Sequence, residues 1–148
     1  MNAVYFDTGV LLKLYTEEPE SDAVRSFVVS RNQPIGVSSL HLAECVSALK
    51  LKCFRRECEE SEAAGAILDI ESDLRAGVLI RSPINWDEAW NQCRTLSESH
   101  TSAEGTRTLD TLHIACALQL GNRHFATSDK RQATLAQRIG LKVEEITR

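Results

Sequence analysis

The sequence predicts a single-domain α/β protein, and three observations support that class. Short apolar runs alternate with helical stretches along the whole chain, and no repeat, linker or low-complexity tract interrupts them. The length of 148 residues and the hydrophobic content of 43% are enough for one genuine core. Alternating strand and helix patterns are typical of helices layered on a mostly parallel sheet. We therefore expect residues 1–148 to fold as one domain.

Five short apolar runs predict strands, and the stretches between them predict helices. The strand candidates are residues 4–7, 35–37, 78–81, 124–126 and 142–144. The helix candidates are residues 9–15, 19 to about 30, 38 or 39 to about 56, 57–76, 86–99, 109–120 and 130 to about 139. Residues 109–120 are apolar on nearly every face and should form a central, buried helix.

Two further features of this pattern bear on function. In the third helix, one apolar stripe is formed by Leu42, Val46, Leu49 and Cys53, and Glu44 lies off it. The polar stretch 100–106 is the only predicted loop of any length, and functional loops are often of this kind.

Charge and targeting signals limit the function classes. The N-terminus has no basic region, and no apolar run approaches the roughly 18 residues that a membrane span needs. We expect a soluble cytoplasmic protein with no membrane partner. The five cysteines, an odd number without a C-x-x-C pair, are interpreted as small buried hydrophobes. Because the net charge is -4, contact with nucleic acid requires a local basic patch.

One such patch ends the third helix. Its members are Lys50, Lys52, Arg55 and Arg56. The alternative interpretation is a solvated helix C-terminus, where the helix dipole favours cations.

Four acids are candidates for one metal site: Asp7, Glu44, Asp110 and Asp129. Asp7 and Asp129 follow strand-like runs, and ligands of parallel sheets bind beyond the carboxyl ends of the strands. Carboxylates gathered there without His or Cys suit Mg²⁺ or Mn²⁺ and not Zn²⁺. Metal-assisted hydrolysis of a phosphodiester is the leading hypothesis.

Each acid also has a structural interpretation. Asp7 could cap the first helix, Asp110 gains from the dipole of its helix, and Asp129 with Gln132 fits a variant capping box. Glu44 has no such explanation, since Ala48 occupies i+4 and a partly buried carboxylate needs a partner. His113 and His41, each three residues from an acid, are interpreted as core imidazoles bonded to backbone and not as co-ligands.

Several other sites find little support. Asp7-Thr8-Gly9 copies the tripeptide of aspartic proteases, but the chain is helix-rich and has one copy. It contains no G-x-x-x-x-G-K-[ST], G-x-G-x-x-G or G-x-S-x-G motif.

With these residues in place, the chain resembles the PIN-domain family, and within it the VapC-like ribonuclease toxins of toxin-antitoxin pairs. Four blocks in the family's order carry the resemblance: residues 5–15, 42–45, 107–115 and 127–131. Ser128 is a departure, since many relatives have an aromatic residue there.

The resemblance implies a three-layer α/β/α fold around a parallel sheet, and a Mg²⁺- or Mn²⁺-dependent endoribonuclease. It also implies a homodimer that is inhibited by a small antitoxin protein. Asp7, Glu44, Asp110 and Asp129 match the family's acidic quartet, and Thr127 matches a helper hydroxyl near it. RNA would lie across the cleft and contact Lys50, Lys52, Arg55, Arg56, Lys130 or Arg131, which position the strand without reading its sequence.

Three rival functions stay open at this stage. One is a non-toxin or catalytically inactive PIN-like module that binds RNA or acts as an adaptor. Another is a phospho-acceptor receiver domain, for which Phe6-Asp7 supplies only one of the two expected acids. A phosphatase with Asp7 as nucleophile lacks the D-x-D partner, because position 9 is Gly.

Overall fold

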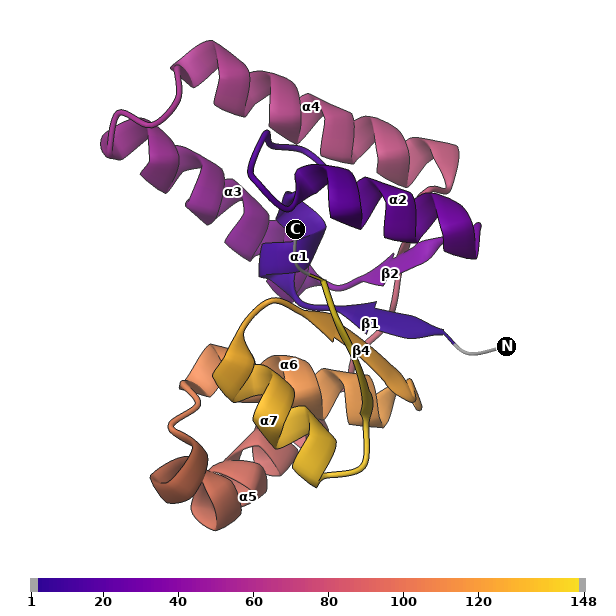
Figure 1. Ribbon diagram of the computed structural model, residues 1–148, viewed down its shortest axis with the longest axis vertical. Coiled ribbons are helices and arrows are strands. Elements are labelled where there is room, and N and C mark those ends of the chain that lie inside the picture. Colours follow the sequence, from indigo (N-terminus) through magenta and orange to yellow (C-terminus); the bar gives the residue numbers. More distant parts are fainter. Residues whose placement is uncertain (1–2, 147–148) are drawn as a thin grey trace. The chain divides into compact units, whose positions relative to one another are not determined.

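Strands and helices alternate as the sequence predicts (Figure 1) in the computed structural model, which describes residues 3–146. The strands are β1 (Val4–Phe6), β2 (Ile35–Val37), β3 (Leu79–Arg81), β4 (His124–Thr127) and β5 (Lys142–Glu145). The helices are α1 (Thr8–Leu12), α2 (Ser21–Arg31), α3 (Ser39–Phe54), α4 (Glu60–Ala76), α5 (Trp86–Glu104), α6 (Thr108–Gln119) and α7 (Lys130–Arg138). The predicted α/β class is confirmed.

The strands pair in parallel, as predicted. One sheet has the order β1-β4-β5 and the other pairs β2 with β3. In the first sheet, Phe6 lies opposite Ala126 and Thr127 lies opposite Glu145. All four residues of β4 are buried, as the middle strand of a covered parallel sheet requires.

The chain divides into two compact units, which are described separately. The first contains residues 3–10 and 83–146, with the β1-β4-β5 sheet and helices α5, α6 and α7. The second contains residues 11–82, with the β2-β3 pair and helices α2, α3 and α4. The expectation of a single domain over residues 1–148 stays a prediction.

In the first unit, α6 packs against α5, and α7 packs against β4 and β5. Seven consecutive residues of α6, from Thr111 to Ala117, are buried, which confirms the central helix that the sequence predicts. On the sheet, the rings of Tyr5 and Phe125 stack with centroids 5.4 Å apart. This core fixes the carboxyl ends of β1 and β4 relative to the start of α6.

The predicted loop at residues 100–106 is wrong, because α5 continues to Glu104. His100, Thr101, Ser102 and Ala103 are polar or small but include no helix breaker, so the helix propagates until Gly105 adopts φ 71°. Glu104 is held by an ion pair with Arg138 of α7. The tertiary contact with α7 therefore stabilises the last turn of α5, which local helix propensity alone does not predict.

In the second unit, α3 and α4 lie side by side (Figure 1). The buried residues of α3 are His41, Cys45 and Leu49, which recur every four residues. The sequence pattern instead places Leu42, Val46, Leu49 and Cys53 on the buried stripe, and Val46 is 42% exposed. The pattern fails because His41 is polar by type yet serves a buried capping box with Ser38.

Other local predictions agree with the structure with small differences. Helix α4 ends at Ala76 and is followed by Gly77, whose φ of 79° is the left-handed conformation expected at that position. Helix α1 ends at Leu12, three residues before the predicted end, and Leu14 and Tyr15 continue in i→i−3 hydrogen bonds. No helix within residues 3–146 is both long and apolar enough to cross a membrane.

The prediction that the cysteines are buried is confirmed in part. Cys45, Cys93 and Cys116 are buried, and burial raises the pKa of the Cys45 thiol to about 12. Cys53 and Cys58 are only half-buried, and their sulfur atoms lie 3.5 Å apart at the turn between α3 and α4.

Candidate active site

Asp7 lies at the carboxyl end of β1, where it is 8% exposed. Its backbone N–H donates to the Ala126 carbonyl at 3.0 Å, which extends the β1-β4 pairing by one step. Its Oδ1 accepts the Val10 N–H at 2.7 Å and so caps α1, as the structural interpretation predicts. Its other oxygen, Oδ2, accepts a hydrogen bond from Thr127 at 2.7 Å. Capping thus uses one carboxylate oxygen and leaves the second directed at the end of β4.

Asp129 is the N-cap of α7 and lies two residues beyond the end of β4 at Thr127. Its Oδ1 accepts the N–H of Gln132 at 2.9 Å, and its own N–H donates to Thr127 Oγ1 at 3.0 Å. The predicted capping box is therefore half present, because the Gln132 side chain does not return to the Asp129 N–H. Asp129 is exposed and remains accessible to ligands.

Asp110 occupies the first turn of α6 and is half-buried. It faces the same pocket as Asp129 does, and this pocket has a volume of about 620 Å³. One wall is formed by Gly105, Thr106, Arg107 and Asp110, and the other by Ser128, Asp129, Lys130 and Arg131. The predicted convergence of these two acids is thus supported within the first unit.

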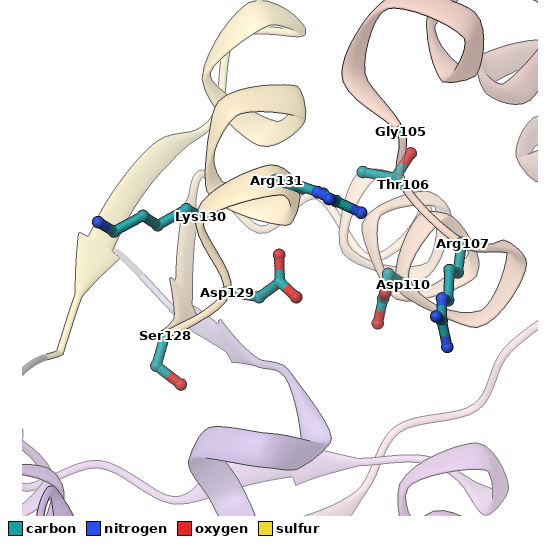
Figure 2. A pocket seen from close by; sticks show the side chains of 8 residues that line it. All are labelled: Gly105, Thr106, Arg107, Asp110, Ser128, Asp129, Lys130 and Arg131. Atoms are coloured by element: carbon teal, nitrogen blue, oxygen red, sulfur yellow. The ribbon is translucent and has the colours of Figure 1, made fainter.

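The side chains that line this pocket point in different directions (Figure 2). The carboxylates of Asp110 and Asp129 point into the space between the two walls, while Lys130 points away from Asp110. The Arg131 side chain reaches the opposite wall, where a Cβ built on Gly105 would lie 3.8 Å from its Cδ. A contact of Arg131 or Lys130 with substrate stays a prediction.

Charge around the pocket differs from that of the whole chain. Three cationic side chains, Arg107, Lys130 and Arg131, accompany two carboxylates in its lining, whereas the net charge of the chain is -4. The pocket therefore has local positive charge that suits a polyanion. Arg107 was not among the predicted substrate contacts, although its place three residues before Asp110 on the same helix start was a signal for it.

Glu44 lies on α3 in the second unit and is half-buried. Its convergence with the three aspartates stays a prediction. Within residues 3–146, no three His, Cys, Asp or Glu side chains already stand close enough together to hold a metal ion. The chemistry of the donor set fits Mg²⁺ or Mn²⁺ nevertheless, since the carboxylates at the pocket are hard oxygen donors with no sulfur among them.

Two histidines near the acids are core residues, as predicted, and their hydrogen-bond partners differ. His113 is 2% exposed, and its ring nitrogens contact the Tyr5 hydroxyl at 2.6 Å and the Thr8 hydroxyl at 3.1 Å. His41 is 1% exposed and accepts the Ser38 N–H at 3.0 Å. Side-chain hydroxyls thus bond the His113 ring, and the expected bond to backbone is present at His41.

The predicted basic patch on α3 is partly neutralised within its own unit. Lys50 forms an ion pair with Glu60. Lys52 Nζ lies 3.7 Å from Glu18 Oε1 and 3.8 Å from Glu57 Oε2. Arg55 and Arg56 are exposed at the C-terminus of α3. A contact between these four residues and RNA stays a prediction.

The chain belongs to the PIN domain family, whose model matches residues 4–137. It is similar to Ribonuclease VapC46 of Mycobacterium tuberculosis (strain ATCC 25618 / H37Rv), with 29% identity over 150 residues that cover 97% of each protein. The predicted family is therefore confirmed.

Solved structures share this fold. Mycobacterium tuberculosis VapC20, a Sarcin-Ricin loop cleaving toxin, matches with a TM-score of 0.66 and 17% identity over 89% of this chain and 95% of that one. FitAcB from Neisseria gonorrhoeae matches with a TM-score of 0.61 and 17% identity over 95% of each chain. A structure of FitAB bound to an IR36 DNA fragment matches with a TM-score of 0.66 and 17% identity over 96% of this chain and 94% of that one.

Proposed function

We propose that the chain is a divalent-metal-dependent endoribonuclease that acts as the toxin of a toxin-antitoxin pair. The observation that carries the proposal is the pocket where Asp110 and Asp129 point into one space edged by Arg107 and Arg131. Membership of the PIN family, a relative named as a ribonuclease and structural neighbours that include a toxin all support it.

The ligand set in this proposal is Asp7, Glu44, Asp110 and Asp129. A divalent cation bound there would lower the pKa of a bound water and stabilise the charge that develops on the scissile phosphate. The chain's own contribution is to hold the carboxylates in place. Backbone N–H groups at the starts of α1 and α7 fix Asp7 and Asp129, and the buried helix α6 carries Asp110.

The cationic side chains have a separate role. Arg107 and Arg131 would neutralise phosphates on either side of the cleaved bond and draw the strand across the pocket. Such contacts are independent of base identity, so they position RNA without selecting a sequence. Because RNA is the substrate, we place the activity in the cytoplasm.

Two partners belong to the same proposal. A homodimer is supported by large apolar side chains that remain exposed on the second unit, among them Phe54 at 84% and Leu68 at 61%. A small antitoxin protein is supported by the toxin among the structural neighbours. Sedimentation that shows only monomer at micromolar concentration would remove the dimer without affecting the nuclease.

The test is cleavage of end-labelled single-stranded RNA by the purified chain. We expect cleavage with Mn²⁺ or Mg²⁺, none with chelator, and restoration when excess metal is added back. The Asp110→Asn protein, purified in parallel, controls for contaminating nuclease and should be inactive. Binding of RNA without cleavage by the parent in any of these metals would instead favour the inactive adaptor.

A further inference from the structure

Gln132, in the first turn of α7, contacts several parts of the proposed metal site. Its side chain is 1% exposed. Its Oε1 lies 2.7 Å from Thr127 Oγ1, and its Nε2 donates to the Asp110 carbonyl at 3.1 Å. Its backbone N–H donates to Asp129 Oδ1 at 2.9 Å. One residue therefore links the end of β4, the start of α6 and the start of α7.

The Thr127 hydroxyl joins Gln132 to Asp7, the third candidate ligand in this unit. Thr127 Oγ1 lies 2.7 Å from Asp7 Oδ2 and 2.7 Å from Gln132 Oε1, and it accepts the Asp129 N–H at 3.0 Å. A hydroxyl has one proton, so only one of the two facing oxygens accepts it fully at a time. The Gln132 oxygen is fixed toward Thr127, since the amide nitrogen is occupied by the Asp110 carbonyl. Gln132 thus offers Thr127 a second acceptor whenever Asp7 Oδ2 is engaged elsewhere.

The Gln132 side chain does not cap helix α7. In a complete capping box, the amide would accept the N–H of Asp129, but that N–H already donates to Thr127. Only the backbone N–H of Gln132 serves the cap. A buried amide costs free energy unless it is hydrogen-bonded, and an apolar side chain of similar size would fill the space without that cost. The position of the amide points to a role at the pocket.

We infer that Gln132 is a positioning residue of the metal site, an inference that rests on the proposed function. Its Oε1 gives the Thr127 hydroxyl a second acceptor beside Asp7 Oδ2, and its Nε2 anchors the first turn of α6 that carries Asp110. Gln132 does not touch the cation or the substrate; it acts through Thr127 and Asp110. Residues that orient metal ligands in this way typically contribute about 10–100-fold in metal affinity.

The test measures the affinity of the RNA-free chain for Mn²⁺. The free Mn²⁺ is detected by its electron paramagnetic resonance signal. Gln132→Met keeps the length of the side chain and removes both amide bonds. Gln137→Met is the matched control, because Gln137 is exposed on the same helix. We expect Gln132→Met to bind Mn²⁺ about 10–100-fold more weakly than the parent, and Gln137→Met to bind it as the parent does. Gln132→Leu serves as a second variant if the Met protein does not fold.

A purely structural role gives a different result. It predicts a lower melting temperature in chelator together with an unchanged Mn²⁺ affinity and an unchanged Mn²⁺ requirement for cleavage. Unchanged affinity in a folded Gln132 variant would overturn the inference while leaving the nuclease proposal intact. A parent chain that does not bind Mn²⁺ would overturn the proposed function itself, and the inference with it.

Discussion

The Thr127 hydroxyl lies 2.7 Å from Asp7 Oδ2 and joins two parts of the chain that are 120 residues apart in sequence. The register of the sheet produces this contact. Phe6 pairs with Ala126, so the next residues of β1 and β4, Asp7 and Thr127, emerge side by side at the carboxyl edge. The parallel pairing thereby fixes the orientation of the Asp7 carboxylate at the carboxyl edge of the sheet.

Replacing Thr127 by valine should weaken metal binding with little change in shape. Thr127→Val removes the bonds to Asp7, Gln132 and the Asp129 N–H. We expect Mn²⁺ affinity to fall by about 10-fold or more and the free energy of unfolding to fall by about 1–3 kcal/mol, because buried polar groups lose their partner. Calorimetric Mn²⁺ titration and urea denaturation measure the two effects.

Thr134→Val is the control, since the Thr134 hydroxyl is exposed and bonds the Lys130 carbonyl of its own helix. It should leave Mn²⁺ affinity unchanged. If Thr127→Val also binds Mn²⁺ as tightly as the parent, Thr127 has no role in the metal site.

Replacing Asp129 by asparagine separates the capping role of this residue from its metal-binding role. Asn is about as good an N-cap as Asp and also removes the negative charge, so Asp129→Asn should be at least as stable as the parent in chelator. With Mn²⁺ at 100 times the parent's Kd, the parent should gain about 2.7 kcal/mol, and a variant that binds 100-fold more weakly only about 0.4 kcal/mol. Urea denaturation in chelator and in Mn²⁺ gives both values.

Asp129→Ala completes the comparison. The lost cap costs about 0.5–2 kcal/mol, and relief of repulsion between the carboxylates offsets that cost, so Asp129→Ala should be about as stable as the parent in chelator. Full Mn²⁺ stabilisation of Asp129→Asn would leave Asp129 as a helix cap and the site with three acids.

Arg107 should contribute to RNA binding through charge. Arg107→Gln removes one cationic side chain from the pocket wall. We expect a raised KM for RNA and a plot of log affinity against log salt that is shallower by about 0.7, the contribution of one phosphate contact on a single strand. Mn²⁺ affinity should not change. Arg123→Gln, at an exposed arginine outside the pocket lining, should keep the parent's slope, and an unchanged slope in Arg107→Gln would exclude the contact.

The Tyr15 hydroxyl should stabilise the second unit in a pH-dependent way. It donates to Asp73 Oδ2 at 2.6 Å, and burial together with this bond raises the pKa of Tyr15 above its ordinary value. Because the pair is partly exposed, we expect Tyr15→Phe to lose about 1–2 kcal/mol near neutral pH. The folded pKa exceeds the unfolded pKa, so this stabilisation is complete below about pH 10 and declines as the pH rises further.

Urea denaturation of parent and Tyr15→Phe at pH 7.5 and pH 10.5 measures the difference, which should shrink at the higher pH. Tyr5 is present in both proteins, so its ionisation cancels. A difference that grows with pH would show that the Tyr15 phenol ionises more readily in the folded state.

Local pattern predicted much of the fold, and its errors have physical causes. Strand positions followed from short apolar runs, and α4 ended as predicted because Gly77 adopts a positive φ. The extension of α5 through residues 100–104 was missed because its ion pair between Glu104 and Arg138 is tertiary. The buried face of α3 was misplaced because His41 is polar by type yet buried in a cap.

The site was predicted in outline and not in its supporting contacts. Asp7, Asp110 and Asp129 could be chosen as candidates because each falls at a strand end or helix start, which sequence pattern reveals. Gln132 was interpreted as part of a capping box, since nothing in the sequence shows that its amide turns toward Thr127 and Asp110. That direction depends on how α6 and α7 pack.

The most direct test of the metal site is the position of Mn²⁺ in a crystal of the chain soaked with the ion, located by anomalous scattering. We expect an anomalous peak at the pocket, about 2.1 Å from oxygens of Asp110 and of at least one of Asp7 and Asp129, with Glu44 completing the ligands. Asp110→Asn crystals soaked in the same way should show a much weaker peak. An ordered Mn²⁺ bound elsewhere, or none at concentrations that support RNA cleavage, would contradict the proposed metal site.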